Sequence, residues 1–124
     1  RLAQVVIFHI TGVWPHLYRP PHGKKTPWEL QQVRKGGLVE VTWSVSTGEL
    51  NTKSAESVAR QIVSKTDAGE IILLHDGYGT EHNNSRADKS LTVEALPLII
   101  AQLQAKGYRF VTIPELLGVP AYHN

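Results

Sequence analysis

Apolar residues of this chain recur at helical spacing in two segments and form short runs between them. The first segment follows Ser54, which can cap a helix, and stops at the Asp67-Ala68-Gly69 break. Its apolar face comprises Ala55, Val58, Ala59, Ile62 and Val63. The second segment is the longest predicted helix and ends at Lys106-Gly107, where glycine suits a left-handed cap. We expect Pro97 to lie within its first turns or to kink it. Its apolar face comprises Leu96, Ile99, Ile100 and Leu103.

Three further helices are predicted more locally. Thr26 can cap a helix in which Pro27 takes the first position and Glu29 completes a capping box, so this helix should run to Gly36-Gly37. The residues from Arg1 onward resemble the last part of another helix, and residues 114–117 are expected to form a short closing one.

Short apolar runs between the helices predict strands. They lie around Leu17-Tyr18, from Leu38 to Trp43, from Ile71 to Leu74 and at Phe110-Val111-Thr112. The run 71–74 has four consecutive apolar residues and is expected to be a buried strand. Alternating strands and helices without internal repeats are typical of βα units that build a parallel sheet. The sequence therefore predicts an α/β fold with about four βα units, and residues 1–124 amount to one domain at most.

Composition indicates a globular protein and excludes several classes. The 124 residues are 41% hydrophobic and 19% charged, which is ordinary for a globular domain. The absence of cysteine excludes a disulfide framework and a thiolate metal site. A formal charge of +2 is too small and too scattered for a nucleic-acid-binding surface. No stretch of the sequence is long and apolar enough to span a membrane.

Reactive side chains follow two of the predicted strands. His75 comes directly after the run 71–74, and catalytic groups of parallel α/β folds lie at the carboxyl ends of strands. Arg19 offers a rigid fork of donors for a carboxylate, and the two prolines after it fix an extended backbone before a turn at Gly23. Together these segments suggest a hydrolase site. The alternatives are a histidine satisfied at a buried strand end and an arginine in a surface ion pair.

Four motifs, taken in order, resemble the polysaccharide deacetylase family, carbohydrate esterase family 4, and its chitooligosaccharide-deacetylase-like homology domain. They are Arg19-Pro20-Pro21-His22-Gly23, Trp43-Ser44-Val45-Ser46-Thr47-Gly48-Glu49, Leu73-Leu74-His75-Asp76 and Gly107-Tyr108-Arg109-Phe110-Val111-Thr112. The resemblance runs from Thr11-Gly12 to Leu116-Leu117-Gly118. It implies a secreted or cell-envelope hydrolase that removes acetyl groups from N-acetylglucosamine polymers, such as peptidoglycan or chitin, or from acetylated xylan.

Two further motifs of the family have no match in this sequence. One is a Thr-Phe-Asp-Asp-Gly type strand end that supplies the catalytic base and a metal-binding aspartate, and the other holds paired metal-binding histidines. The resemblance thus implies the carboxyl-terminal half of a distorted (β/α) barrel of about seven strands, with the first half missing. It also implies a divalent metal, zinc or another ion, whose ligands lie upstream of Arg1. We expect such a half to need a partner, either the amino-terminal half of the domain or a second chain.

The resemblance also implies roles for individual residues. His75 matches the histidine that acts as general acid on the leaving group, and Arg19 matches the arginine that holds the catalytic aspartate. His22 stands where many members have tyrosine, a position whose backbone N–H contacts the oxyanion. Leu73 matches the apolar residue that contacts the acetyl methyl group, with ordinary core packing as the alternative.

One family motif departs from its usual pattern here. Glu49-Leu50 stands where the family usually has Asp-Trp, so Glu49 keeps a carboxylate that can orient His75. The aromatic wall formed by tryptophan is lost. Trp43, or alternatively Trp14, is the candidate to replace that wall against substrate, and a core aromatic is the competing interpretation of either residue.

Other interpretations stay open at this point. A non-catalytic carbohydrate-binding or assembly module, a pseudoenzyme half-barrel, is the first alternative. An unrelated flavodoxin-like domain ranks last because no glycine-rich phosphate loop is present. Asp76, His75 and His82 lack the spacing of a convergent ligand set, so no metal ligand is assigned within the chain. The polar segment from Asp76 to Ser90, with Glu81, His82, Asn83 and Asn84, is either a substrate-contacting loop or a surface insertion.

Overall fold

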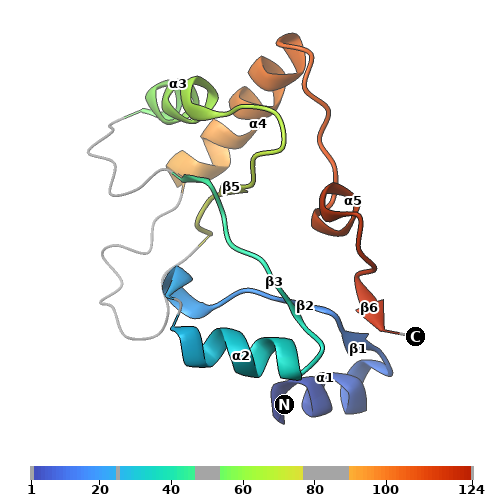
Figure 1. Ribbon diagram of the computed structural model, residues 1–124. Helices are drawn as coiled ribbons and strands as arrows, with labels where there is room; N and C mark the ends of the chain where they lie inside the picture. The colour runs from blue at the N-terminus through green and yellow to red at the C-terminus, as the bar shows by residue number, and fades with distance from the viewer. Residues whose placement is uncertain (1, 25, 47–53, 77–89, 124) are drawn as a thin grey trace. The chain divides into compact units, whose positions relative to one another are not determined.

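The computed structural model describes residues 2–24, 26–46, 54–76 and 90–123, which form helices and short strands (Figure 1). The chain divides into two compact units. The first comprises Arg1–Thr42 and Val111–Asn124, and the second comprises Trp43–Phe110. The fold is therefore mixed α/β, and the middle of the chain forms one of the two units.

Helices α1 (Leu2–Thr11) and α2 (Pro27–Lys35) belong to the first unit and confirm two sequence predictions. Thr26 caps α2 as expected. Its hydroxyl accepts a hydrogen bond from the Glu29 N–H at 3.2 Å, and the Glu29 carboxylate accepts one from the Thr26 N–H at 3.1 Å. This reciprocal pair satisfies backbone donors that the first helical turn leaves free. Gly36 ends the helix at the predicted place.

Two short ladders occupy the same unit. Strand β2 (Leu17–Tyr18) pairs in parallel with β3 (Val39–Glu40), in the register Leu17 to Val39. Strand β1 (Trp14–Pro15) pairs antiparallel with β6 (Tyr122–His123), which brings the last described residues beside the first turn of the chain after α1. The predicted strand 38–43 is thus limited to Val39–Glu40, and the antiparallel ladder was not predicted from the sequence.

The strand predicted at Phe110-Val111-Thr112 is wrong. No residue from 108 to 112 is in a strand, and Phe110 is 46% exposed. Thr112 instead caps helix α5 (Ile113–Leu117), because its hydroxyl accepts a hydrogen bond from the Glu115 N–H at 3.4 Å. A threonine followed by a proline at the helix start outweighs the β propensity of the apolar residues before it. The short closing helix itself is confirmed.

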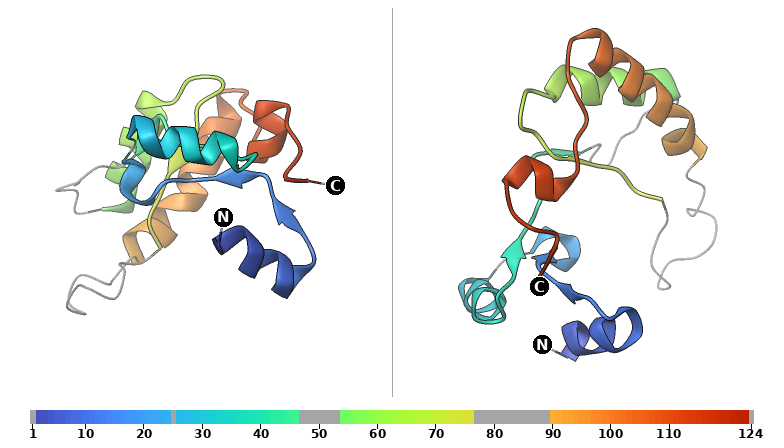
Figure 2. Two further views of the ribbon diagram at one scale, coloured as in Figure 1. Left: turned by 60° about the horizontal axis from the view of Figure 1, so that its bottom comes forward. Right: turned by 90° about the vertical axis from the view of Figure 1, so that its right-hand side faces the viewer.

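The second unit is built around helices α3 (Ala55–Lys65) and α4 (Ser90–Ala105), which lie side by side in every view (Figures 1 and 2). The predicted apolar face of α3 is confirmed, and all five of its residues are buried. On α4, Ile99 and Leu103 are buried, whereas Leu96 is 44% exposed and Ala95 takes its place in the core. The buried core consists of Val45, Ala55, Val58, Ala59, Ile62, Val63, Ala95, Ile99 and Leu103.

The end of α4 matches its prediction closely. Gly107 adopts a left-handed backbone at φ +87°, and its N–H donates to the Gln104 carbonyl at 2.9 Å. The Tyr108 N–H donates to the Leu103 carbonyl at 3.1 Å, which completes a Schellman cap. Pro97 lies inside the helix, where its missing N–H leaves the Val93 carbonyl without a helical donor. Val93 is 71% exposed, so water can satisfy that carbonyl.

Strands β4 (Val45–Ser46) and β5 (Ile72–Leu73) pair in parallel beside these helices, with Val45 opposite Ile72. The predicted strand 71–74 is therefore present but shorter. Its expected full burial is wrong, since residues 71–74 are only half-buried. Within this unit β5 pairs with β4, and a strand with one described neighbour keeps part of its surface accessible.

Candidate functional site

His75 lies two residues beyond the end of β5, at the carboxyl end of a strand that runs parallel to β4. Backbone bonds from Ser44 and Val45 to the Ile71 carbonyl, both at 3.1 Å, fix the start of this strand. The His75 side chain is exposed rather than buried, as is Asp76. A histidine at this edge is accessible to a ligand, and its position matches the prediction.

Side chains alternate along β5 between the core and the opposite face. Ile72 and Leu74 pack against the buried core. Successive residues of an extended strand point to opposite faces, so Leu73 lies on the face of β5 away from the core. Leu73 is half-buried and pairs with Ser46 across the ladder. Trp43, also half-buried, precedes β4 in the same unit.

Arg19 and His22 belong to the first unit, directly after β2. Arg19 is exposed and precedes Pro20, which is buried and extended at φ −65° and ψ 138°. His22 lies in the short 3-10 turn η1 (Pro21–Gly23), which the Gly23 N–H closes by donating to the Pro20 carbonyl at 3.1 Å. The turn expected at Gly23 is thus confirmed, with Gly23 at φ +65°.

His22 itself has an unusual backbone conformation that was not predicted from the sequence. It is the one described non-glycine residue with positive φ, at φ 57° and ψ 13°. A left-handed non-glycine residue costs about 1–3 kcal/mol, and such residues cluster at functional sites. No described residue accepts a hydrogen bond from the His22 N–H. Among the described residues, this N–H therefore has no acceptor, and it belongs to an exposed residue.

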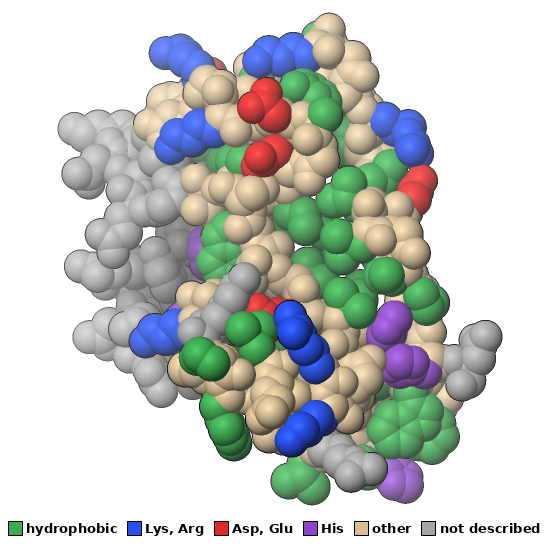
Figure 3. All heavy atoms as spheres, in the orientation of Figure 1, with side chains coloured by type: hydrophobic (Ala, Val, Ile, Leu, Met, Phe, Trp, Pro, Cys, Tyr) green, Lys and Arg blue, Asp and Glu red, His purple; other side chains and the backbone are tan. Residues whose placement is uncertain are grey.

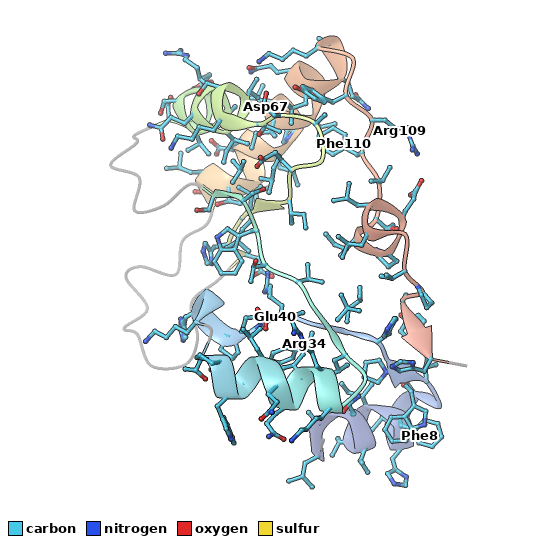
Figure 4. The ribbon with its side chains drawn as sticks, in the orientation of Figure 1. Phe8, Arg34, Glu40, Asp67, Arg109 and Phe110 are labelled. Carbon is cyan, nitrogen blue, oxygen red and sulfur yellow. The ribbon has the colours of Figure 1, made fainter. Side chains whose placement is uncertain are left out.

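The structure places the remaining candidates as follows. Glu49 lies outside the described residues, as do Glu81, His82, Asn83 and Asn84. Trp14 stacks on Phe8, which Figure 4 labels, with ring centroids 4.7 Å apart and planes 16° from parallel, within the first unit. Its ring face is used in that stack, which leaves Trp43 as the better candidate for an aromatic wall.

The two predicted sets of site residues therefore belong to different units. Arg19 and His22 are in the first unit, and Trp43, Leu73 and His75 are in the second. Among the residues that the structure describes, no group of three histidine, aspartate or glutamate side chains could hold a metal ion. In the same part of the chain, no helix is long and apolar enough to cross a membrane.

The fold and sequence both match known deacetylases. A peptidoglycan N-acetylglucosamine deacetylase of Bacillus cereus is 35% identical over 105 residues, which cover 83% of this chain and 46% of that protein. A chitooligosaccharide deacetylase of Azorhizobium caulinodans is 31% identical over 116 residues, which cover 90% of this chain and 55% of that protein. No family model matches the chain.

A solved structure extends the likeness to three dimensions. The crystal structure of a peptidoglycan N-acetylglucosamine deacetylase superposes on 97% of this chain and 53% of its own, with a TM-score of 0.81 and 28% identity. This chain belongs to the polysaccharide deacetylase family, carbohydrate esterase family 4. The resemblance found in the motifs is thereby confirmed.

The extent of the match also defines what part of a deacetylase this is. The chain spans about half the length of these curated relatives, and less of others. It corresponds to a partial domain of the polysaccharide deacetylase fold.

Proposed function

We propose that this chain is the carboxyl-terminal half of a metal-dependent deacetylase domain that hydrolyses acetyl groups from an acetylated polysaccharide. The observation that carries the proposal is the superposition of 97% of the chain on a peptidoglycan N-acetylglucosamine deacetylase. An N-acetylglucosamine polymer such as peptidoglycan or chitin, or an acetylated xylan, is the substrate, and the enzyme acts outside the cell or at the cell envelope.

His75 is the general acid of this proposal. Hydrolysis of an acetamide needs a proton for the departing amine, because an unprotonated amine leaves poorly, and a histidine suits this task near neutral pH. Its exposure at the carboxyl end of β5 makes the imidazole accessible. In this proposal Leu73 contacts the acetyl methyl group and Trp43 contacts the sugar.

His22 contributes its main chain rather than its imidazole. When water attacks the acetyl carbonyl, the oxygen gains negative charge that a fixed N–H donor stabilises. The left-handed turn holds the His22 N–H away from any described acceptor, so this donor costs no rearrangement when the charge develops. Arg19 is a positioning residue that would orient a carboxylate supplied from outside this chain. Glu49 would also be a positioning residue, because its carboxylate would orient the imidazole of His75.

The family implies a divalent metal, zinc or a similar ion, and the described residues do not provide its site. They contain no group of three potential ligands, and the cysteines that could supply thiolates are absent from the sequence. The ligands of such an ion would therefore come from another part of the domain. We assign no step of the reaction to it.

A distorted (β/α) barrel is the architecture proposed for the complete domain. Each ladder described in this chain has two strands, which leaves edges that further strands of the domain can pair with. Intact mass measurement under native and denaturing conditions would identify the other half of the domain as part of the same polypeptide or as a bound fragment.

The test of the catalytic assignment is acetate release by the complete domain. His75→Ala is expected to lower kcat by about 100-fold, because the leaving group loses its proton donor. The matched control is His9→Ala, which removes an exposed histidine of α1 and should leave kcat unchanged. Near-normal turnover by His75→Ala, with the metal content unchanged, would remove His75 from the mechanism.

A non-catalytic carbohydrate-binding or assembly module is the alternative function. It is the weaker proposal, because relatives at 31–35% identity carry the names of deacetylases. Acetate release measured side by side on peptidoglycan, chitin oligomers and acetylated xylan discriminates the two. Turnover on one of these polymers identifies the substrate class, whereas saturable binding without acetate release from any of them would support the alternative.

A further inference from the structure

Two histidines far apart in the sequence meet on the antiparallel ladder of the first unit. Trp14 pairs with His123 in the β1–β6 ladder, and the His16 N–H extends it by donating to the Ala121 carbonyl at 3.1 Å. His16 and His123 are thus diagonal neighbours on one face of the ladder. Their ring centroids are 4.3 Å apart, with planes tilted by 54°. Histidine side chains gather at the surface beside β6 (Figure 3).

Each ring is oriented by a backbone carbonyl. The Nδ1 atom of His16 lies 2.7 Å from the Pro120 carbonyl oxygen, and the Nε2 atom of His123 lies 2.8 Å from the Gly37 carbonyl oxygen. A carbonyl oxygen only accepts hydrogen bonds, so both of these ring nitrogens must be the protonated donors. In neutral rings the lone pairs then belong to Nε2 of His16 and Nδ1 of His123. No described residue donates a hydrogen bond to either lone pair.

We propose that His16 and His123 form a two-histidine binding site for a divalent transition-metal ion of the zinc and copper class. Metal-binding histidines almost always donate their second ring N–H to a carbonyl or carboxylate, which fixes the tautomer and makes the other nitrogen a better ligand. Both rings here have that arrangement. Imidazole nitrogen suits zinc, copper and nickel, and water would complete the coordination.

The backbone around the pair is held firmly enough to keep both ligands in place. His16 bonds the ladder on each side, because its N–H donates to Ala121 and its carbonyl accepts from the Val39 N–H at 2.8 Å. Gly37, whose carbonyl oxygen lies 2.8 Å from the His123 Nε2 atom, has a left-handed backbone at φ +71° that glycine adopts without steric cost. A bound ion would thus join β6 to β1 and stabilise the carboxyl-terminal segment.

The test is calorimetric titration of the tag-free complete domain with Zn²⁺, after any deacetylase metal site has been filled. His16→Asn and His123→Gln are the informative variants, since each keeps an amide N–H for the carbonyl and removes the ligand nitrogen. We expect the wild type to bind one more equivalent than either variant, or to bind it about tenfold or more tightly. The matched control, His9→Ala, should bind as the wild type does.

A second measurement separates binding from folding. Zn²⁺ should raise the Tm of the wild type and of His9→Ala but not of the two ligand variants, whose Tm without metal should stay close to that of the wild type. Equal stoichiometry and affinity in all four proteins would overturn the proposal. Loss of the additional bound equivalent of Zn²⁺ in His9→Ala would overturn the proposal as well. Acetate release does not enter this test, so its outcome is independent of the deacetylase assignment.

Discussion

At the scale of single residues, the backbone of His22 links conformation to chemistry. Its left-handed φ of 57° is costly for a side chain and natural for glycine. We predict that His22→Gly keeps kcat within about threefold, because the N–H donor remains, and changes the unfolding free energy by at most about 1 kcal/mol, toward higher stability. Acetate release by the complete domain measures kcat, and its urea unfolding measures the unfolding free energy. A large fall in kcat would show that the imidazole itself acts.

The positions of some single residues could be predicted from the sequence, whereas those of others could not. The positions of Arg19, His22 and His75 after strands could be predicted, because strand propensity and proline restrict the backbone locally. The left-handed backbone of His22 could not be predicted, since only a few per cent of non-glycine residues adopt a positive φ, even though histidine is enriched among them. Leu96 was expected in the core, yet Ala95 is buried there instead, because the side of a helix that is covered depends on its tertiary partner.

At the scale of elements, α2 depends on its capping box. Thr26→Ala removes the hydroxyl that accepts from Glu29 and is expected to lower the unfolding free energy by about 1 kcal/mol. Gln31→Ala is the control, because Gln31 is exposed within the same helix and takes no part in the cap. Urea unfolding of the two variants and the wild type measures these differences in unfolding free energy. Equal stability of all three would mean that α2 does not form part of the cooperative unit.

The start of α3 makes a prediction about pH. Glu56 lies in the first turn, and hydrogen bonds to the backbone and then to the Ser54 hydroxyl hold the pKa of its carboxyl below the ordinary 4.5. Its stabilising contribution is therefore complete above the unfolded pKa and lost as the pH falls through the folded pKa. Glu56→Gln should lower stability at neutral pH and reduce the loss of stability on acidification to about pH 3. Parallel acid dependence of both proteins would contradict this assignment.

Helices were predicted better than strands, for a physical reason. The signals for α2, α3 and the end of α4 are local, because caps and apolar faces act within a few residues of the chain. Strand length is set by the partner, and each described ladder here pairs two residues with two. The β1–β6 ladder joins residues more than a hundred positions apart, and no local sequence pattern predicts such a pairing.

At the scale of the whole molecule, the two units differ in how much apolar surface they bury. All nine residues of the buried hydrophobic core belong to the second unit. In the described part of the first unit, α1 exposes large apolar side chains instead, with Leu2 at 85% and Ile10 at 78%. Burial of such side chains stabilises a fold by about 1.5–3 kcal/mol each, so a unit that leaves them exposed has little stability of its own.

This difference predicts how the chain behaves alone and within a complete domain. In the isolated 124-residue chain, amide hydrogens of α3 and α4 should exchange more slowly than those of α1 and α2, because only the former pair packs on a buried core. In the complete domain, the amides of α1 and α2 should gain protection by about tenfold or more, as the other half covers the exposed apolar faces. Hydrogen exchange followed by mass spectrometry compares the two proteins directly. Equal protection of the first unit in both would mean that these faces do not receive the rest of the domain, and the half-barrel proposal would then fail while the family assignment stands.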